Sequence, residues 1–206
     1  MIWGPVLKRD LLGETREEDK IRSRDQLIEY LKAEIKKQGE QVVIKGLILT
    51  EDIDDLSGLF YKIADGVKSL DLSDWRTSNV VNMSGMFAHC ENLKELDLPI
   101  PVNVKNLSYM FYKCSNLESL ELSLWNTTNV EDMFSMFYGC TNLKSLDLTS
   151  FDTSNVEDMS LMFANCENLE SLDLSNWDTS NVKDMIGIFD SCPALYKVVD
   201  NQIIKK

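Results

Sequence analysis

Five cysteines recur along this sequence, and their thiols have the widest range of chemistry of any side chains in it. They are Cys90, Cys114, Cys140, Cys166 and Cys192, separated by 24 and then three times by 26 residues. Zinc sites usually need close pairs such as Cys-x-x-Cys, and this sequence has none. Stacked copies of a repeat could bring neighbouring thiols to disulfide distance. The odd count and the fixed repeat position instead favour buried thiols that pack as small hydrophobic groups.

The other reactive side chains predict no catalytic centre. The sequence contains one histidine, His89, which lies beside Cys90 in a single repeat. It shows no paired nucleophile and base, no phosphate-binding loop and no general-acid arrangement. We therefore expect a protein that is not an enzyme and that uses neither a metal nor a cofactor.

Acidic side chains form the second recurring set, and we name it the acidic column. Its members each lie between two leucines of a Leu-x-Leu pair: Asp71, Asp97, Glu121, Asp147 and Asp173. In a strand such a residue points away from the core, and stacked strands lie about 4.8 Å apart. Like charges placed directly opposite each other are destabilising, so the column calls for an explanation. It is either an inherited feature of the repeat that also prevents unwanted association, or a stripe that receives a basic partner; cation binding is a third reading.

These residues belong to five copies of one repeat. The third copy shows the full pattern, with Leu120, Leu122, Trp125, Asn129, Val130, Met133, Phe137 and Cys140. Leu-x-Leu has the period of a strand. From Val130 to Phe137 the apolar spacing fits one face of a helix, with Asn as its N-cap and an acidic residue in its first turn. The asparagine column at Asn79, Asn103, Asn129, Asn155 and Asn181 is expected to bond the loop backbone.

One such unit cannot bury its apolar face alone, so stacked copies are expected to share a continuous core. The prediction is an α/β fold: a right-handed leucine-rich-repeat solenoid, with a parallel sheet on one side, short helices on the other and an N-terminal helical cap. We expect an N-terminal arm and capping helix over 1–39 and an atypical first repeat over 40–69. Five repeats of 24–26 residues follow over 70–197, and a C-terminal cap over 198–206.

The second copy is irregular, because it has 24 residues where the others have 26. Its loop runs through Pro99-Ile100-Pro101 in place of the usual aromatic residue. Proline cannot donate a hydrogen bond to a sheet, so pairing is expected to stop early and leave a notch. We predict that Trp75, Ile100 and Trp125 line this notch as apolar anchors for a partner. The alternative is plain decay of one repeat that its neighbours tolerate.

The charge balance limits the classes of partner. The net charge is −13, which repels nucleic acid and anionic membranes and attracts basic proteins. We therefore expect a protein partner with a basic surface and no direct binding to nucleic acid. The pattern does not specify the oligomeric state.

The motif Leu-Asp-Leu-Ser-x-Trp-x-Thr-Ser-Asn-Val-x-x-Met, followed by Phe and Cys, is carried most closely by residues 172–192. It resembles the BspA-like leucine-rich repeat of bacterial surface proteins and mycoplasma lipoproteins, over about 70–198 and more weakly over 40–69. The resemblance implies a non-catalytic binding protein, often an adhesin. Since the sequence as written has no transmembrane span and no signal peptide, we expect a cytoplasmic protein, or a cell-surface or secreted one if Met1 is not the natural start.

Three functions remain open from the sequence. The first is a protein-binding repeat module of the BspA-like kind that uses its acidic sheet face. The main alternative is an acidic cytosolic inhibitor, such as one of phage type, that occupies the basic nucleic-acid channel of an enzyme such as an RNA-guided nuclease. The third is a small structural repeat protein that self-associates through its ends.

Overall fold

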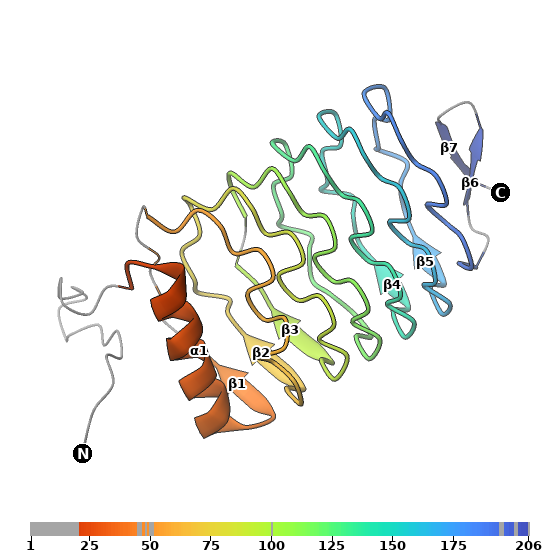
Figure 1. The fold of residues 1–206 in the computed structure, drawn as a ribbon. Coiled ribbons are helices and arrows are strands. Elements are labelled where there is room, and N and C mark those ends of the chain that lie inside the picture. Colours follow the sequence, from red (N-terminus) through yellow and green to blue (C-terminus); the bar gives the residue numbers. More distant parts are fainter. Residues whose placement is uncertain are drawn as a thin grey trace, which may run out of the picture.

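The computed structural model describes residues 21–44, 47, 49, 52–99, 101–193, 196–199 and 202–205. Along these residues, successive coils of the chain lie side by side, with helix α1 at one end of the row and strands β6 and β7 at the other (Figure 1). The predicted arm over residues 1–20 and the predicted anchor Ile100 lie outside the described residues. A coil in such a row has two neighbours, so each repeat position of one coil meets the same position of the next.

Helix α1 (Arg24–Gln38) lies within the region 1–39 where the sequence predicts a capping helix. The Ser23 hydroxyl accepts a hydrogen bond from the Gln26 amide, and this N-cap satisfies one of the free amides of the first turn. At the other end Gly39 adopts a φ of 76° and its amide bonds the Ile35 carbonyl. Leu27 and Leu31 are fully buried, so one face of the helix packs on the first coil.

Parallel strands run along one side of the coils, as predicted, but they form two sheets. The first sheet has the order β1 (Gln41–Val43), β2 (Ser69–Asp71) and β3 (Glu95–Asp97), and the second pairs β4 (Ser145–Leu146) with β5 (Ser171–Leu172). The register joins equivalent repeat positions, since Leu70 lies opposite Leu96 and Leu146 opposite Leu172. These leucines are buried, and the residues on either side of each leucine in its own strand point outward.

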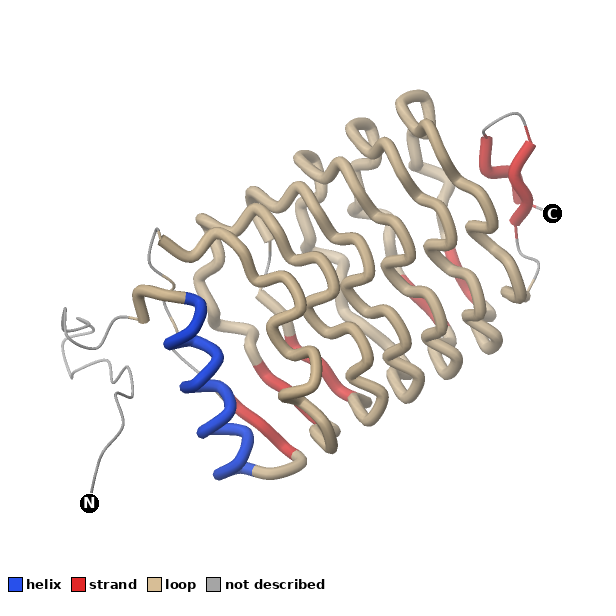
Figure 2. Tube along the Cα trace, viewed as in Figure 1, coloured by secondary structure: helices blue, strands red, loops and turns tan. Residues whose placement is uncertain are grey.

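The break between the two sheets falls at the irregular copy. No described residue between β3 and β4 belongs to a strand, so the strand predicted at Leu120–Leu122 is wrong (Figure 2). Pro99 and Pro101 follow β3 directly, and proline has no N–H for a sheet ladder. The coil is also two residues shorter than its neighbours. β3 nevertheless ends at the same repeat position as β2, with Asp97 opposite Asp71, so the predicted early end of pairing is not observed; what is observed is that β3 has no strand partner on its other side among the described residues.

The short helices predicted on the other side of the coils are absent from the described residues, and turns replace them (Figure 2). Along each turn segment the amides bond alternately. The Phe137 amide bonds the Met162 carbonyl of the next coil at 2.9 Å, whereas the Met136 amide bonds the Met133 carbonyl of its own coil at 3.2 Å. An α-helix would direct every amide to the carbonyl four residues earlier. The prediction that the apolar residues from Val130 to Phe137 form one buried face is confirmed, but turns rather than a helix form that face.

Two left-handed residues in each coil explain why no helix forms. Ser135 has a φ of 52° and Gly139 a φ of 70°, and the equivalent residues of the other coils share this conformation. Such residues cannot continue a right-handed helix. They turn the chain so that alternate amides and carbonyls point along the row, where the neighbouring coils satisfy them.

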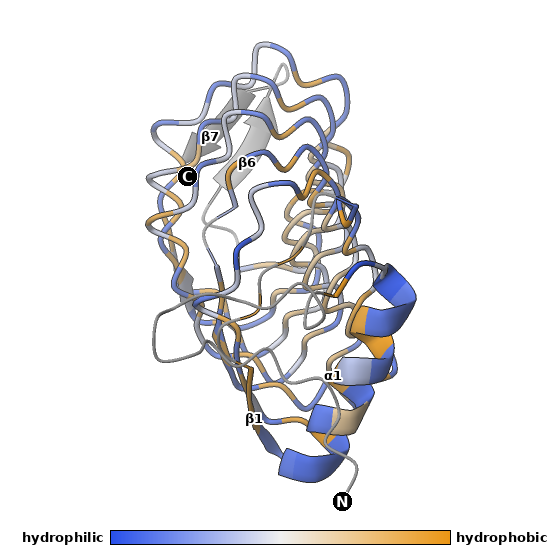
Figure 3. Cartoon of the chain, turned by 90° about the vertical axis from the view of Figure 1, so that its left-hand side faces the viewer, coloured by the Kyte–Doolittle hydropathy of each residue, from blue (hydrophilic) through white to orange (hydrophobic). Residues whose placement is uncertain are grey.

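The core is a set of columns that run along the row. Phe60, Phe87, Phe111, Phe137, Phe163 and Phe189 stack with ring centroids 5.1–5.8 Å apart and ring planes within 14° of parallel. Seen from the α1 end, hydrophobic stretches of successive coils fall at similar places (Figure 3). Each ring except those at the two ends contacts two others, so removing one ring affects three coils.

The chain ends differently from the prediction. Val198 was expected to hold the next parallel strand position of the row. Instead β6 (Tyr196–Val199) pairs with β7 (Gln202–Lys205) in antiparallel fashion, with Val198 opposite Ile203. The two strands satisfy each other as a hairpin, so the parallel order ends at β5 within the described residues.

Candidate functional site

The acidic column lies on the outer side of the strands. Asp71 and Asp97 are direct partners in the register of β2 and β3. Asp97, Glu121, Asp147 and Asp173 are exposed, and Asp71 is partly exposed. The prediction that these side chains point away from the core is confirmed by their exposure. The strand order brings like charges to equivalent places on successive coils.

Local hydrogen bonds hold most of these carboxylates in place. Four of the five accept the amide of the residue two positions later, as Asp147 does from Thr149 at 3.0 Å and Glu121 does from Ser123 at 2.9 Å. The Thr149 hydroxyl adds a second bond to the same Asp147 oxygen at 2.6 Å. The residue two positions after Asp97 is Pro99, which has no amide hydrogen to donate. The column therefore also shapes the turn that leaves each strand.

These bonds keep the carboxylates charged. The hydroxyl and amide of Ser123 lower the pKa of Glu121, and those of Thr149 lower the pKa of Asp147, because hydrogen bonds to the ionised form favour it. The neighbouring charges of the column act in the opposite direction and weaken the effect. At neutral pH Glu121 and Asp147 are therefore ionised.

Other acidic positions differ, because lysines of neighbouring coils neutralise them. Four ion pairs of this kind join adjacent coils: Lys68 with Glu40, Lys105 with Glu131, Lys144 with Glu118 and Lys183 with Glu157. Within the part of the chain that the structure describes, no lysine or arginine pairs with Asp97, Glu121 or Asp147. The centre of the acidic column thus faces solvent without an internal counter-charge.

A second polar column caps the turns rather than helices. Its members are Asp55, Asn82, Asn106, Asp132, Asp158 and Asp184, joined from coil to coil by isolated parallel bridges. Each side chain accepts the amide two residues later, as Asp132 does from Phe134 at 2.8 Å. The predicted role of Asp132 in a first helical turn is therefore wrong. Half-burial raises the pKa of Asp132, and the charge of Asp158 adds to this.

The asparagine column bonds the loop backbone, as predicted. Asn155 donates its side-chain amide to the Thr128 carbonyl at 2.8 Å, and Asn181 donates to the Ser154 carbonyl at 2.6 Å. Both bonds join one coil to the one before it. These residues join neighbouring coils, so we look for the candidate binding surface at other positions.

The tryptophans predicted to line a notch lie in the core. Trp75 and Trp125 are each only 4% exposed. The Trp75 indole donates to the Ile44 carbonyl at 3.1 Å, and Trp125 stacks on Phe151 with ring centroids 6.3 Å apart. Since the third predicted anchor, Ile100, lies outside the described residues, the notch has no exposed aromatic wall. Large aromatic side chains are stabilised by burial in the core, and buried tryptophans cannot contact a partner.

The cysteines lie beside the phenylalanine column. Cys90, Cys114, Cys140 and Cys166 are buried free thiols, and Cys192 is only partly buried. The Cys140 thiol donates to the Phe111 carbonyl of the preceding coil at 3.1 Å. Burial raises the pKa of Cys140 to about 12 and that of Cys192 to about 11. The prediction of buried thiols holds for four positions, and Cys192 departs from it because its coil is the last of the repeat.

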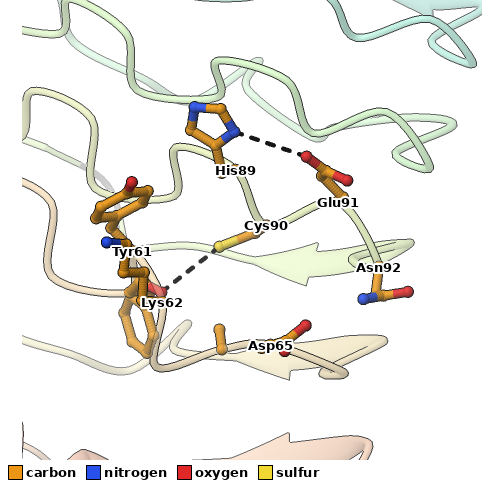
Figure 4. A pocket seen from close by; sticks show the side chains of 9 residues that line it. Tyr61, Lys62, Asp65, His89, Cys90, Glu91 and Asn92 are labelled. Carbon is orange, nitrogen blue, oxygen red and sulfur yellow. Dashed lines mark hydrogen bonds and ion pairs between the residues drawn. The ribbon is translucent and has the colours of Figure 1, made fainter.

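One pocket opens between the first two coils, with a volume of about 360 Å³ (Figure 4). Tyr61 and Lys62 line one side, and His89 and Glu91 form a pair on the other with His89 Nδ1 3.6 Å from Glu91 Oε1. The Cys90 thiol points toward the Phe60 carbonyl at 3.8 Å, and burial raises its pKa to about 12. A thiol is a weak nucleophile when it stays protonated. The pocket has mixed charge and a size at the lower end for small-molecule sites.

Sequence reasoning missed a set of aromatic residues on the turn side of the coils, which we name the aromatic strip. Tyr61, His89 and Tyr109 of this set are exposed, and the other members are partly buried. It consists of Tyr61, His89, Tyr109, Tyr112, Phe134 and Tyr138, joined by ring contacts from one coil to the next. Comparing the copies position by position would have found it. Tyr109, for example, stands where the adjacent copies carry Gly85 and Ser135.

A family model matches most of the chain. The description of that family is "Mycoplasma protein of unknown function, DUF285", and it matches residues 46–118 and 105–204. The chain belongs to this family. The match agrees with the resemblance to BspA-like and mycoplasma repeats in the sequence. The family's description names no function, and no curated protein matches this sequence.

Two solved structures of leucine-rich repeat proteins are similar to the chain. A leucine-rich repeat protein from Eubacterium ventriosum is 20% identical, with a TM-score of 0.49, and the match covers 78% of this chain and 41% of that one. The T. pallidum leucine-rich repeat protein TpLRR is 18% identical, with a TM-score of 0.38, and the match covers 75% of this chain and 78% of that one. The chain thus spans less than half the length of the E. ventriosum protein.

No helix among the described residues has the length and apolarity that crossing a bilayer requires. Among the same residues, no three histidine, cysteine or carboxylate side chains cluster closely enough to hold a metal ion.

Proposed function

We propose that this chain is a non-catalytic protein-binding repeat module that holds a basic surface of a partner protein against its acidic column. The observation that supports the proposal is the contrast between acidic positions. The glutamates of other columns pair with lysines of neighbouring coils, whereas Asp97, Glu121 and Asp147 pair with no described cation. A folded chain that can place lysines opposite carboxylates, but does not do so here, leaves a charge that a partner can neutralise.

Two physical effects favour a basic partner at this surface. The net charge of −13 attracts cations from a distance and speeds their association at low salt. Hydrogen bonds to Ser123 and Thr149 fix the carboxylates of Glu121 and Asp147, so little side-chain freedom is lost when a partner binds. The like charges that repel one another in the free protein would then be relieved in the complex.

The proposal includes the finer parts of the predicted architecture. We take the row of coils to be a solenoid of right-handed sense, because parallel strands joined by crossover connections are right-handed in nearly all proteins. We take α1 to be a cap, because Leu27 and Leu31 cover the apolar end of the first coil. A cap and a regular row keep the acidic column rigid.

The proposal is tested with a ten-residue lysine peptide as a basic probe. Fully extended, this peptide reaches about 33 Å, which exceeds the roughly 19 Å expected across five stacked strands. The column variant is Asp97→Asn, Glu121→Gln and Asp147→Asn; the amide oxygens that replace the carboxylates can still accept the turn bonds. Its matched control is Glu118→Gln, Glu131→Gln and Glu157→Gln, which removes the same charge from lysine-paired positions.

Association rates are measured by stopped flow over a range of salt concentrations. We expect the column variant to associate more slowly, with a flatter dependence on salt, and to keep its stability. The control variant should behave like the parent chain. Equal slowing in both variants would show that net charge alone governs binding, and the proposal would then be wrong.

A further inference from the structure

The aromatic strip is a continuous surface of rings on the turn segments. Ring centroids lie 5.7 Å apart for Tyr61 and His89, 5.3 Å for His89 and Tyr112, and 4.9 Å for Tyr112 and Tyr138. Tyr109 extends the strip edge-on, at 5.5 Å from Tyr112 and 4.9 Å from Phe134. Because the rings contact one another, they are held in place before any partner arrives.

The core of the coils does not need these rings. The phenylalanine column fills the interior in every coil, whereas the strip positions carry small residues in other copies. Phe134 stands where the two adjacent copies have Ser108 and Ser160, and Tyr138 stands where the next copy has Ala164. The copies therefore show that stacking requires the phenylalanine column, and that the aromatic strip is mainly an addition of the second and third copies.

Tyr109 adds a cost that the stack would avoid with glycine. Its φ is 57°, a left-handed conformation that disfavours residues with a side chain, and the equivalent residue of the preceding coil is Gly85. Its side chain is 41% exposed, so burial does not repay the strain. Ser135 and Leu161 share this conformation at the equivalent position, so the left-handed turn belongs to the repeat and the exposed ring is what sets Tyr109 apart.

Two rings of the strip already contact cations of the chain itself. The Lys62 ammonium lies over the Tyr61 ring at 5.0 Å, and the Lys113 ammonium lies over the Tyr112 ring at 5.3 Å. Two carboxylates act on the Tyr109 end: after burial and the neighbouring Tyr112, the charges of Asp132 and Asp158 raise the pKa of the Tyr109 phenol. Aromatic rings beside carboxylates suit a cation that comes from outside.

We propose that the aromatic strip is a second binding surface, and that Tyr109, Phe134 and Tyr138 receive arginine side chains of a protein partner. The inference shares the basic partner of the proposed function but rests on other residues of another face. Arginine fits better than lysine, because its planar guanidinium stacks on rings while it bonds carboxylates. Tyrosine and arginine are also the residues that dominate binding energy at protein interfaces.

The test compares three nine-residue peptides made of arginine, lysine or glutamine, with dissociation constants from titration calorimetry at physiological salt. The strip variant is Tyr109→Ser with Phe134→Ser, since serine occupies the same positions in neighbouring coils and is compatible with the fold. We expect the arginine peptide to bind the parent chain more tightly than the lysine peptide. The strip variant should bind the arginine peptide about tenfold more weakly.

Further arms identify the cause of any loss. Tyr109→Leu with Phe134→Leu keeps an apolar surface without the ring quadrupole, so it should lose arginine binding as the serine variant does. Retained binding in the leucine variant, or equal binding of the glutamine peptide, would overturn the assignment of a cation. Unfolding by urea confirms that both variants stay folded.

The column variant described above separates this inference from the proposed function. If arginine binding falls in the column variant and not in the strip variant, the strip is wrong and the acidic column stands. If it falls in the strip variant while lysine association is unchanged in the column variant, the strip stands and the proposed function is wrong.

Discussion

Replacing Gly139 by alanine tests whether the repeat contains stacked turns or short helices, because the two structures predict opposite signs. In a helix interior, alanine is more favourable than glycine by about 1 kcal/mol. In the structure, Gly139 is buried with a φ of 70°, where a side chain costs about 1–2 kcal/mol. The stiffer unfolded chain offsets about 0.4–1 kcal/mol of that cost.

The new methyl group also meets the preceding coil. A Cβ on Gly139 would lie 3.2 Å from Lys113 Cγ and 3.7 Å from Lys113 Cα. The lysine stem is exposed and flexible enough to yield by a few tenths of an ångström, so this contact adds little. We expect Gly139→Ala to lower the free energy of unfolding by about 1 kcal/mol, or the melting temperature by about 2–4 °C for a chain of this size.

Urea unfolding followed by circular dichroism and tryptophan fluorescence measures the change. Gly85→Ala is the matched control, with a φ of 58° and no atom closer than 3.6 Å to the added Cβ; it should destabilise by a similar or smaller amount. Asn165→Gly, at the position equivalent to Gly139, should stabilise by a few tenths of a kcal/mol because it removes a side chain from a φ of 58°. Higher stability in Gly139→Ala would refute the turn structure and favour the helix.

Three other predictions follow from the columns. Phe137→Ala should cost roughly 3–5 kcal/mol in unfolding free energy, because the fully buried ring stacks on both neighbours. Thiol labelling of the native protein should modify Cys192 first, since it alone is partly exposed, and release the four others only on unfolding; early labelling of Cys140 would contradict its burial. Asp132→Asn should raise the free energy of unfolding slightly at pH 7, because solvent screens this half-exposed charge. The raised pKa of Asp132 means that its charged form weakens the fold above that pKa, so the gain should vanish as the pH falls below it. Asp184→Asn is its control with the opposite sign: hydrogen bonds lower the pKa of Asp184, which then contributes stability that is lost only at acid pH.

The repeat made most of the fold predictable. Leu70, Leu96, Leu146 and Leu172 recur in register, and the structure pairs them in parallel strands. The helix over Arg24–Gln38 carries both of its end signals in the sequence, Ser23 and Gly39. The outward direction of the acidic column follows from strand alternation alone.

The turn segments were not predictable by the same reasoning. Apolar residues at Val130, Met133 and Phe137 fit a helical face, and nothing in that spacing reveals that alternate amides bond a different coil. The glycines at 85, 139 and 187 were the available indication, since they occupy left-handed positions that other copies fill with larger residues.

The candidate site was predicted in part. The acidic positions are exposed as expected. The tryptophans are buried, because Trp75 against the tilted Phe60 ring and Trp125 stacked on Phe151 gain more contact than a surface position would give. The aromatic strip consists of positions at which individual copies differ from their neighbours. A comparison of the residues that all copies share does not find such positions.

The stacking of the coils can be observed directly through the hydrogen bonds that join them. Scalar couplings across N–H···O=C bonds, measured by NMR on the deuterated protein, identify the carbonyl that each amide contacts. The Phe137 amide should couple to the Met162 carbonyl and the Gly139 amide to the Ala164 carbonyl, at N–O distances of 2.9 and 2.8 Å. A coupling from the Phe137 amide to the Met133 carbonyl, four residues earlier in the same coil, would instead show a helix and contradict the row of stacked turns that carries both proposed surfaces.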